Sequence, residues 1–439
     1  MSTPVTAETP ESPEPSGPSL ARETGRSAGK IGISLLVAIG LGYVFTFVSA
    51  IVLGPANNAV FASFWGILMG LGGALSPLEQ ELSRQSAVAS VAGHRVGRSA
   101  LRVLAVGMVA VAVVAAITLA VPVLNERFYG GHLELGIITL CGGIAFACQF
   151  ATRGLLVGGN AIKPYSRLVV AEAAIRAVLM GLVVVSAISG ITTFAIAAAA
   201  GSFAWLLFVR PARRMLDFEV DGEGWRPVTA RMLVLLLGAG LTASVITGYP
   251  ALVRVLAPGG DEQQIGILFA ALQVSRVPLL LLTPLQALAV PTVVRLSGTA
   301  DGMHRLRRLL AFGTLGTIGV GVLGVVVGWL IGPWLVELLF RSKYAGAQGW
   351  WIAGMVWGAV LLTALQLMTA VLVARTQANR VLVTWAVVAV ATALVLVLVP
   401  GDTVLRAVLG LAIGPTAGLV VALGFVLRRP GNVPDAPGV

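Results

Sequence analysis

Five charged side chains lie inside long apolar stretches of this sequence. They are four arginines and one glutamate, namely Arg153, Arg176, Arg254, Arg276 and Glu172. A charge at the centre of a bilayer costs roughly 2.5 to 3.5 kcal/mol on insertion scales, so each one needs a partner, water or a function. A guanidinium group stays ionised and binds phosphate oxygens in pairs. The arginines therefore predict a path along which an anionic diphosphate group is passed from one to the next.

Each of these charges also has a purely structural interpretation. Glu172 and Arg176 are four residues apart, so they share a helix face and can neutralise each other. Arg153 and Arg254 lie near the ends of their stretches, where a long side chain can reach the membrane surface. Arg276 has no acidic residue within one helical turn, and it is therefore the strongest candidate for substrate binding.

Uncharged and acidic side chains supply the remaining polar candidates. Gln149 and Gln273 can face sugar hydroxyls, although glutamines also join neighbouring membrane helices. Glu79 and Glu81 lie in SPLEQELSR at the end of an apolar stretch. They are either gate residues that pair with loop arginines or part of an ordinary solvated helix end.

The sequence contains no constellation typical of an enzyme or a metal site. The histidines, His94, His132 and His304, fall in three separate polar joins, and Cys141 and Cys148 are seven residues apart in one stretch. Such cysteines cannot reach each other along one helix, so no disulfide is expected. The net charge of +11 is not gathered into a basic stripe with aromatics, which argues against nucleic acid. We expect no enzyme activity and no cofactor.

The composition is that of a membrane protein. Charged residues make up 11% of the 439 residues, hydrophobic residues 57%, and the mean hydropathy is +0.92, whereas about a quarter of a soluble domain is charged. A helix needs about 20 apolar residues to cross the hydrocarbon layer. Twelve such windows occur, at 31–53, 57–78, 101–124, 135–158, 166–188, 190–209, 231–256, 264–293, 308–331, 350–374, 379–399 and 404–427. An all-α polytopic fold of about 12 transmembrane helices is predicted.

The distribution of basic residues predicts the orientation. Arginine and lysine gather in the two tails and in alternate joins, and cytoplasmic segments are the ones that collect such residues. Both termini are therefore predicted to be cytoplasmic. The long polar join near residue 210 divides the windows six and six. The predicted organisation is a disordered tail, a first six-helix lobe, a linker, a second six-helix lobe and a second disordered tail, at 1–30, 31–209, 210–230, 231–428 and 429–439.

A weak repeat relates the two predicted lobes. VLGP ends the first window at Pro55 and VLAP ends the seventh at Pro258, and each is followed by a helix with a hydroxyl-Pro-Leu step, at Pro77 and at Pro284. Proline frees a backbone carbonyl and bends a membrane helix. The matched prolines suit hinges of a transporter with two lobes repeated about the membrane normal, although a simple packing kink is equally compatible.

Two segments resemble a known family. They are LGPANNAVFASFWGILMGLGGALSPLEQELSR, from Leu53 to Arg84, and RGLLVGGNAIKPYSRLVVAEAAIR, from Arg153 to Arg176. Both are similar to the oligosaccharide flippase branch of the multidrug/oligosaccharidyl-lipid/polysaccharide (MOP) exporter superfamily, particularly its actinobacterial members.

The resemblance implies two six-helix lobes around a central cavity in a bacterial plasma membrane, and alternating access to the two sides. It implies an anionic, polyprenyl-diphosphate-linked oligosaccharide as the cargo, with membrane lipids and polysaccharide polymerases or glycosyltransferases as partners. A monomer is expected. Lipid II flippases have two further spans that are not found here.

Two other transporter classes stay open at this point. A multidrug exporter of the same superfamily moves organic cations and needs acidic residues inside its spans, and Glu172 is the only deep one. A major facilitator also has six plus six spans, but GHRVGR, from Gly93 to Arg98, lacks the acidic residue of that family's loop motif. The sign of the buried charge favours anionic cargo.

Overall fold

The computed structural model describes residues 17–186, 188, 190–280, 300–374 and 377–427, and these residues are almost entirely helical. The helices are α1 (Gly17–Ala74), α2 (Ser76–Val91), α3 (Ser99–Ala120), α4 (Pro122–Tyr129), α5 (Leu133–Gly158), α6 (Ile162–Val185), α7 (Ile191–Ala200), η1 (Gly201–Phe208), α8 (Val209–Arg213), α9 (Trp225–Ile246), α10 (Tyr249–Leu256), α11 (Glu262–Leu280), α13 (Ala300–Phe340), η2 (Ser342–Tyr344), α14 (Gly349–Ala374), α15 (Ala378–Leu398) and α16 (Thr403–Leu427). The prediction of an all-α polytopic fold is confirmed.

The predicted membrane windows overlap these helices, although the window 231–256 covers two of them, α9 and α10, and α13 is longer than the window 308–331. In the described part of the chain, ten helical segments are long and apolar enough to cross a membrane, and the first of them, Gly32–Val91, covers two predicted windows. The eighth window begins on α11, and the rest of it, including Pro284, lies outside the described residues. The side of the membrane that the termini face stays a prediction.

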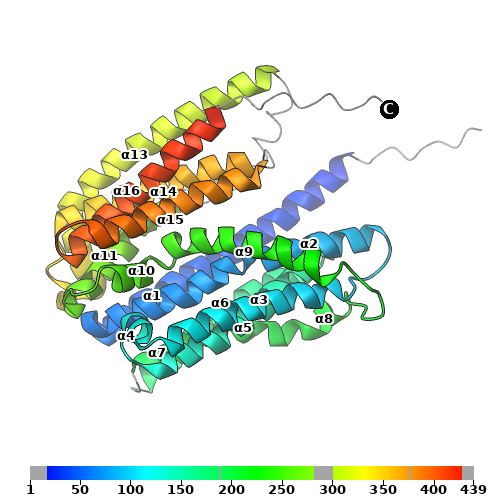
Figure 1. The fold of residues 1–439 in the computed structure, drawn as a ribbon, viewed down its shortest axis with the longest axis horizontal. Helices are drawn as coiled ribbons and strands as arrows, with labels where there is room; N and C mark the ends of the chain where they lie inside the picture. The colour runs from blue at the N-terminus through cyan, green and yellow to red at the C-terminus, as the bar shows by residue number, and fades with distance from the viewer. Residues whose placement is uncertain (1–16, 187, 189, 281–299, 375–376, 428–439) are drawn as a thin grey trace, which may run out of the picture.

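Helix α1 is a helical hairpin rather than one straight rod. The ring of Phe45 stacks on that of Trp65 with centroids 5.1 Å apart, although 20 residues of straight helix span about 30 Å. The reversal falls at Gly54, whose φ of 74° and ψ of 171° are not helical and whose positive φ favours glycine. Pro55 follows and begins the returning arm. The first and second predicted spans therefore form one hairpin (Figure 1).

The helices pack as two lobes around two hydrophobic cores. One core is built mainly from the first half of the chain and includes Phe64, Leu78 and Phe146. The other is built mainly from the second half and includes Phe269 and Trp385. The lobes lie close together at the end where α4 and α10 meet, on the left in Figure 1, and they diverge toward the end where α2 ends and α13 begins. We call these the closed end and the open end.

Helix α9 connects the two lobes and contributes to both cores. Its first half places Val228, Met232 and Leu236 in the core of the first lobe, whereas Val245, near its end, lies in the core of the second. A turn at Gly248 then leads into α10. The predicted boundaries at 210–230 and 231 stay predictions, but packing joins the first half of α9 to the first lobe.

The linker before α9 is tied to the first lobe by its backbone. The amide of Val96 donates to the carbonyl of Met215 at 2.9 Å, and the amide of Asp217 donates back to Val96 at 2.8 Å. The amide of Arg98 donates to the carbonyl of Val220 at 3.0 Å. The linker is therefore held against the loop between α2 and α3, so it will move with the first lobe.

Candidate transport pathway

A cavity of about 480 Å³ lies between the two lobes, and we call it the central cavity. Helix α1 supplies one side of it, and α10, α11 and the turn between α9 and α10 supply the other. Its lining is Ile39, Gly42, Tyr43, Thr46, Ala62, Trp65, Met69, Gly73, Thr247, Pro250, Phe269, Leu272, Gln273 and Arg276. Among these lining residues Arg276 is the only charged side chain.

Arg276 and Gln273 face the central cavity from α11. They are three residues apart, which places them on one helix face. Within the described residues Arg276 forms no ion pair, its Nη2 atom has no hydrogen-bond partner, and the same is true of Oε1 of Gln273. A buried guanidinium without a partner is costly, so this pair is the part of the predicted site that is prepared for an anionic ligand.

Glu172 is the centre of a buried polar cluster inside the first lobe. Its carboxylate accepts a hydrogen bond from Nε2 of Gln149 at 2.5 Å. It forms ion pairs with Arg176, at 2.6 Å, and with Arg153. All three charged side chains are about one-tenth exposed. The predicted pair of Glu172 and Arg176 thus exists and includes Arg153 as well.

Trp65 separates this cluster from the central cavity. The guanidinium of Arg176 lies 5.9 Å from the centroid of the Trp65 ring, and Trp65 lines the cavity. On another side Arg176 lies 5.6 Å from the ring of Phe146, and its Nε donates to the carbonyl of Ala198 at 2.9 Å. Arg176 can therefore influence the cavity through Trp65 but does not line it.

Arg254 lies at the closed end, where its side chain is buried between the two lobes. Its side chain is 6% exposed and forms an ion pair with Glu262 at 2.5 Å. Its Nε donates to the carbonyl of Arg127 at 2.9 Å, and Nη1 of Arg127 donates to the carbonyl of Val255 at 2.7 Å. The four arginines therefore occupy three different environments, of which only that of Arg276 is open to the central cavity.

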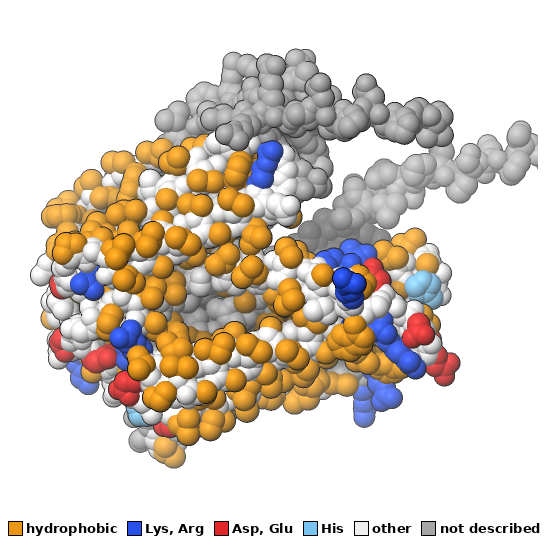
Figure 2. All heavy atoms as spheres, in the orientation of Figure 1, with side chains coloured by type: hydrophobic (Ala, Val, Ile, Leu, Met, Phe, Trp, Pro, Cys, Tyr) orange, Lys and Arg blue, Asp and Glu red, His pale blue; other side chains and the backbone are white. Residues whose placement is uncertain are grey.

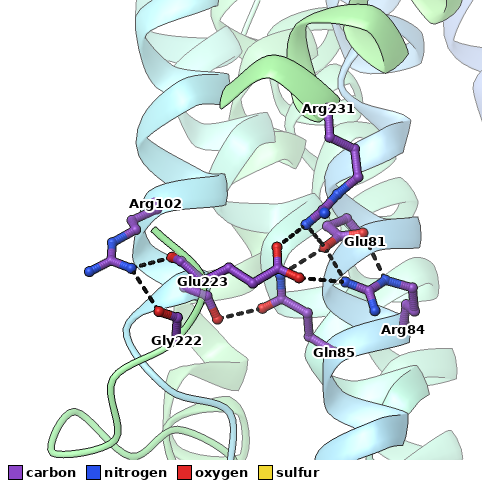
Figure 3. Close-up of polar contacts among 8 residues, drawn as sticks. Glu81, Arg84, Gln85, Arg102, Gly222, Glu223 and Arg231 are labelled. Carbon is purple, nitrogen blue, oxygen red and sulfur yellow. Dashed lines mark hydrogen bonds and ion pairs between the residues drawn. The ribbon is translucent and has the colours of Figure 1, made fainter. Parts of the chain in front are cut away.

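The two predicted gate glutamates lie in different surroundings. Glu79 accepts a hydrogen bond from the hydroxyl of Tyr165 on α6 at 3.0 Å, within the first lobe. Pro77 lies in the first turn of α2, where proline is readily accommodated, just after the break at Leu75. Glu81 instead faces α9 and the linker, as Figure 3 shows.

Glu81 holds together a network at the open end of the first lobe. Its side chain is 4% exposed and forms ion pairs with Arg84 and Arg231, both at 2.8 Å. Arg231 also pairs with Glu223 of the linker at 2.5 Å, and Gln85 donates to Glu81 at 2.8 Å (Figure 3). Both arginine partners of Glu81 lie on helices rather than in loops, Arg84 on α2 and Arg231 on α9. A gate role for Glu81 stays a prediction.

Several contributors to these sites gave little signal in the sequence. Tyr43 and Trp65 line the central cavity but look like ordinary apolar-span aromatics. Arg127 contacts the backbone of α10 from 128 residues away. The only sign of its importance in the sequence was that it is one of the few basic residues in the joins predicted to lie outside the cytoplasm.

The fold resembles solved structures of transporters of the MOP superfamily. The chain resembles an inward-facing multidrug resistance MATE family transporter of that superfamily with a TM-score of 0.65, at 15% identity, over 90% of this chain and 97% of that one. The TM-score against an outward-facing structure of such a transporter is 0.57, also at 15% identity. A MOP superfamily transporter from Pyrococcus furiosus matches with a TM-score of 0.55 over 91% of this chain and 95% of that chain, at 15% identity. The fold is therefore that of a multi-pass membrane protein of the MOP type.

Sequence comparison identifies relatives of higher identity than these solved structures. No family model matches the sequence. The uncharacterized protein Rv1510 of Mycobacterium tuberculosis (strain H37Rv) is 30% identical over 429 residues, which cover 95% of this chain and 94% of that protein. The uncharacterized protein Rv3630 of the same strain is 28% identical over 413 residues, or 92% of each chain. This chain belongs to the same family as Rv1510.

Proposed function

We propose that the protein is an alternating-access membrane transporter that flips an anionic lipid-linked substrate, a polyprenyl-diphosphate-linked oligosaccharide, from the inner to the outer leaflet. The observation that carries the proposal is Arg276, a single unneutralised guanidinium in the wall of the central cavity. A guanidinium binds phosphate oxygens in pairs and stays charged. The neighbouring Gln273 has a free amide oxygen that can accept a hydrogen bond from a sugar hydroxyl.

The arrangement of the lobes supports alternating access. They meet at the closed end and diverge toward the open end (Figure 1), and the fold is more similar to an inward-facing than to an outward-facing structure. If the basic joins are cytoplasmic, the open end faces the leaflet in which such a substrate is made. Enzymes that build or polymerise the glycan are the expected partners, and a monomer is the expected state.

The charge of the cavity argues against an organic cation as the cargo. None of the described residues that line the central cavity is acidic, and Glu172 is already shared between Arg153 and Arg176. Another protein with this fold has a binding pocket of unusual polarity. In the MOP superfamily transporter from Pyrococcus furiosus, the reverse polarity of the binding pocket suggests a different function.

A MATE-type exporter of small solutes is the second candidate. Tyr43, Trp65 and Phe269 give the central cavity three aromatic side chains, and aromatic rings suit flat organic compounds. The cargo would then be an organic anion or a neutral compound rather than a lipid.

The two candidates are separated by reconstituting the full chain in liposomes with two probes. One probe is a fluorescent polyprenyl-diphosphate sugar whose outer-leaflet fraction is read by a membrane-impermeant quencher. The other is a water-soluble aromatic anion trapped inside the vesicles. We expect the lipid to flip and the soluble anion to stay. Release of the soluble anion without lipid flipping would replace the flippase by the exporter.

A further inference from the structure

A second, larger hollow lies on the membrane-facing side of the molecule, between α3 and α9, and we call it the lipid groove. Its volume is about 850 Å³. Helix α9 lines it with one face, through residues that recur every three or four positions, and the returning arm of α1 forms its floor. The lining is Leu71, Ala74, Leu75, Ala105, Val106, Val109, Ala110, Val111, Val113, Val114, Trp225, Thr229, Leu233, Leu236, Leu237, Gly240, Leu241 and Ser244.

The lipid groove is almost wholly hydrocarbon and its rim is exposed. Apart from Trp225, only Thr229 and Ser244 carry a polar side-chain atom. Val109 is 62% exposed and Leu237 is 59% exposed. Figure 2 shows apolar side chains along the borders of a hollow beside α9 and basic side chains near the end where α9 begins. In a membrane such a hollow will be filled by hydrocarbon.

The dimensions of the groove suit a lipid chain. On α3 the lining runs from Ala105 to Val114, which is about 14 Å at 1.5 Å per residue. One leaflet contributes half of the ~30 Å hydrocarbon layer. A chain that enters from the end where α9 begins can therefore lie along the groove for the depth of one leaflet.

The end of the groove has the chemistry of a headgroup site. Trp225 is 57% exposed, and the guanidinium of Arg102 lies 6.0 Å from the centroid of its ring. Arg226, the next residue of α9, is exposed and forms no ion pair within the described residues. Tryptophan and arginine prefer the level of the headgroups, and basic residues there attract anionic lipids.

We propose that the lipid groove is a binding site for an anionic phospholipid. One acyl chain lies between α3 and α9, and the phosphate lies beside Arg226 and Arg102. The occupant is a resident membrane lipid rather than the transported substrate, because a close contact between Gly73 and Ala243 separates the groove from the central cavity. A Cβ added to Gly73 would lie only 3.0 Å from the Ala243 side chain. The site would strengthen the packing of α9 on the first lobe.

The test uses native mass spectrometry of the delipidated full chain. Phosphatidylglycerol is titrated against phosphatidylcholine with identical chains, and polyprenyl phosphate is added as a competitor. Leu237→Trp fills the groove from α9 and Val109→Trp fills it from α3. The matched control is Leu330→Trp, because Leu330 is a 72% exposed apolar residue on α13. Arg226→Gln removes one headgroup charge.

The proposal predicts that phosphatidylglycerol is retained in preference to phosphatidylcholine. Arg226→Gln should lower its affinity about fivefold, the effect of roughly one basic residue near a membrane surface. Both groove-filling variants should lose the bound lipid, and Leu330→Trp should keep it. The proposal would be overturned if Leu237→Trp and Val109→Trp retained as much phosphatidylglycerol as the control Leu330→Trp. Displacement of phosphatidylglycerol by an equal amount of polyprenyl phosphate would also overturn it, because the groove would then belong to the substrate. Neither outcome depends on transport.

Discussion

Arg254 donates a hydrogen bond to the backbone of Arg127, and Arg127 donates one to the backbone of the residue that follows Arg254. Nε of Arg254 donates to the carbonyl of Arg127 at 2.9 Å, and Nη1 of Arg127 donates to the carbonyl of Val255, the residue after Arg254, at 2.7 Å. Arg127 belongs to α4 in the first lobe and Arg254 to α10 in the second. The reciprocal pair therefore holds the closed end together, and it must separate if the closed end is to open.

The first prediction concerns this reciprocal pair. Replacing Arg127 or Arg254 by alanine should favour the state in which the closed end has opened. A hydrogen bond to a charged group contributes about 1.5 to 3 kcal/mol, so each variant should shift the equilibrium by roughly tenfold or more. Spin labels at Val123→Cys and Gln263→Cys, in a background with Cys141→Ala and Cys148→Ala, would report a longer distance. Lys343→Ala, an exposed basic residue, is the control, and distances that match the control would refute the role of the pair.

The second prediction concerns the close approach of α1 and α11. A Cβ on Gly266 would lie 1.8 Å from the carbonyl oxygen of Pro55, so Gly266→Ala cannot be accommodated in the closed end as it stands. Overpacking costs typically 1 to 3 kcal/mol. The variant should show a lower thermal midpoint or the longer spin-label distance. Gly424→Ala, where nothing lies within 4 Å of the added Cβ, should behave as the parent, and identical behaviour of the two variants would show that the contact is unimportant.

The third prediction concerns Glu172. Glu172→Gln leaves Arg153 and Arg176 buried without their shared carboxylate. Removing one member of a buried ion pair costs about 3 to 5 kcal/mol, so the thermal midpoint in detergent should fall clearly. Adding Arg176→Gln to Glu172→Gln should recover part of the loss because one unpaired charge disappears. No destabilisation, or a further fall in the double variant, would contradict this account of the cluster.

The fourth prediction concerns the linker. Glu81 accepts from Arg84, Gln85 and Arg231 at once, and Arg231 also holds Glu223. Glu81→Gln should loosen residues 214–224 and speed their amide hydrogen exchange, which mass spectrometry of the peptides would detect. Glu219→Gln, at an exposed position of the same linker, should not. Unchanged exchange in Glu81→Gln would mean that the backbone bonds from Val96 hold the linker alone.

The sequence predicted the elements of the fold well because apolar length is a strong signal. The hairpin at Gly54 and Pro55 followed from it directly. The helix ends were less predictable, because the window 231–256 covers two helices, α9 and α10, and α13 extends beyond the window 308–331 at both ends. The lack of an ion-pair partner for Arg276 was also predictable, because its neighbours in the sequence include no acidic residue within one helical turn. The pairing of Arg153 with Glu172, across 19 residues and two helices, could not be read in that way.

The contacts between the lobes were the least predictable part. The contact of Arg254 with the first lobe was hidden in the sequence, because the acceptor there is a backbone carbonyl 127 residues away. A backbone acceptor can belong to any residue type, so it leaves no mark in a sequence. The division of α9 between two cores was hidden for the same reason, since an apolar helix gives no sign of which neighbour it packs against.

The most direct test of the central claim is the rate of flipping of a fluorescent polyprenyl-diphosphate sugar in proteoliposomes that contain Arg276→Ala, Arg276→Lys or the intact chain. Arg210→Ala, an exposed arginine at the open end, is the matched control. The account predicts that the intact chain and Arg210→Ala flip the lipid. Arg276→Ala should lose flipping by about tenfold or more, as expected for the loss of a charge-assisted bond. Arg276→Lys should keep part of the activity because the charge remains. Flipping by Arg276→Ala at the rate of the intact chain would contradict the account.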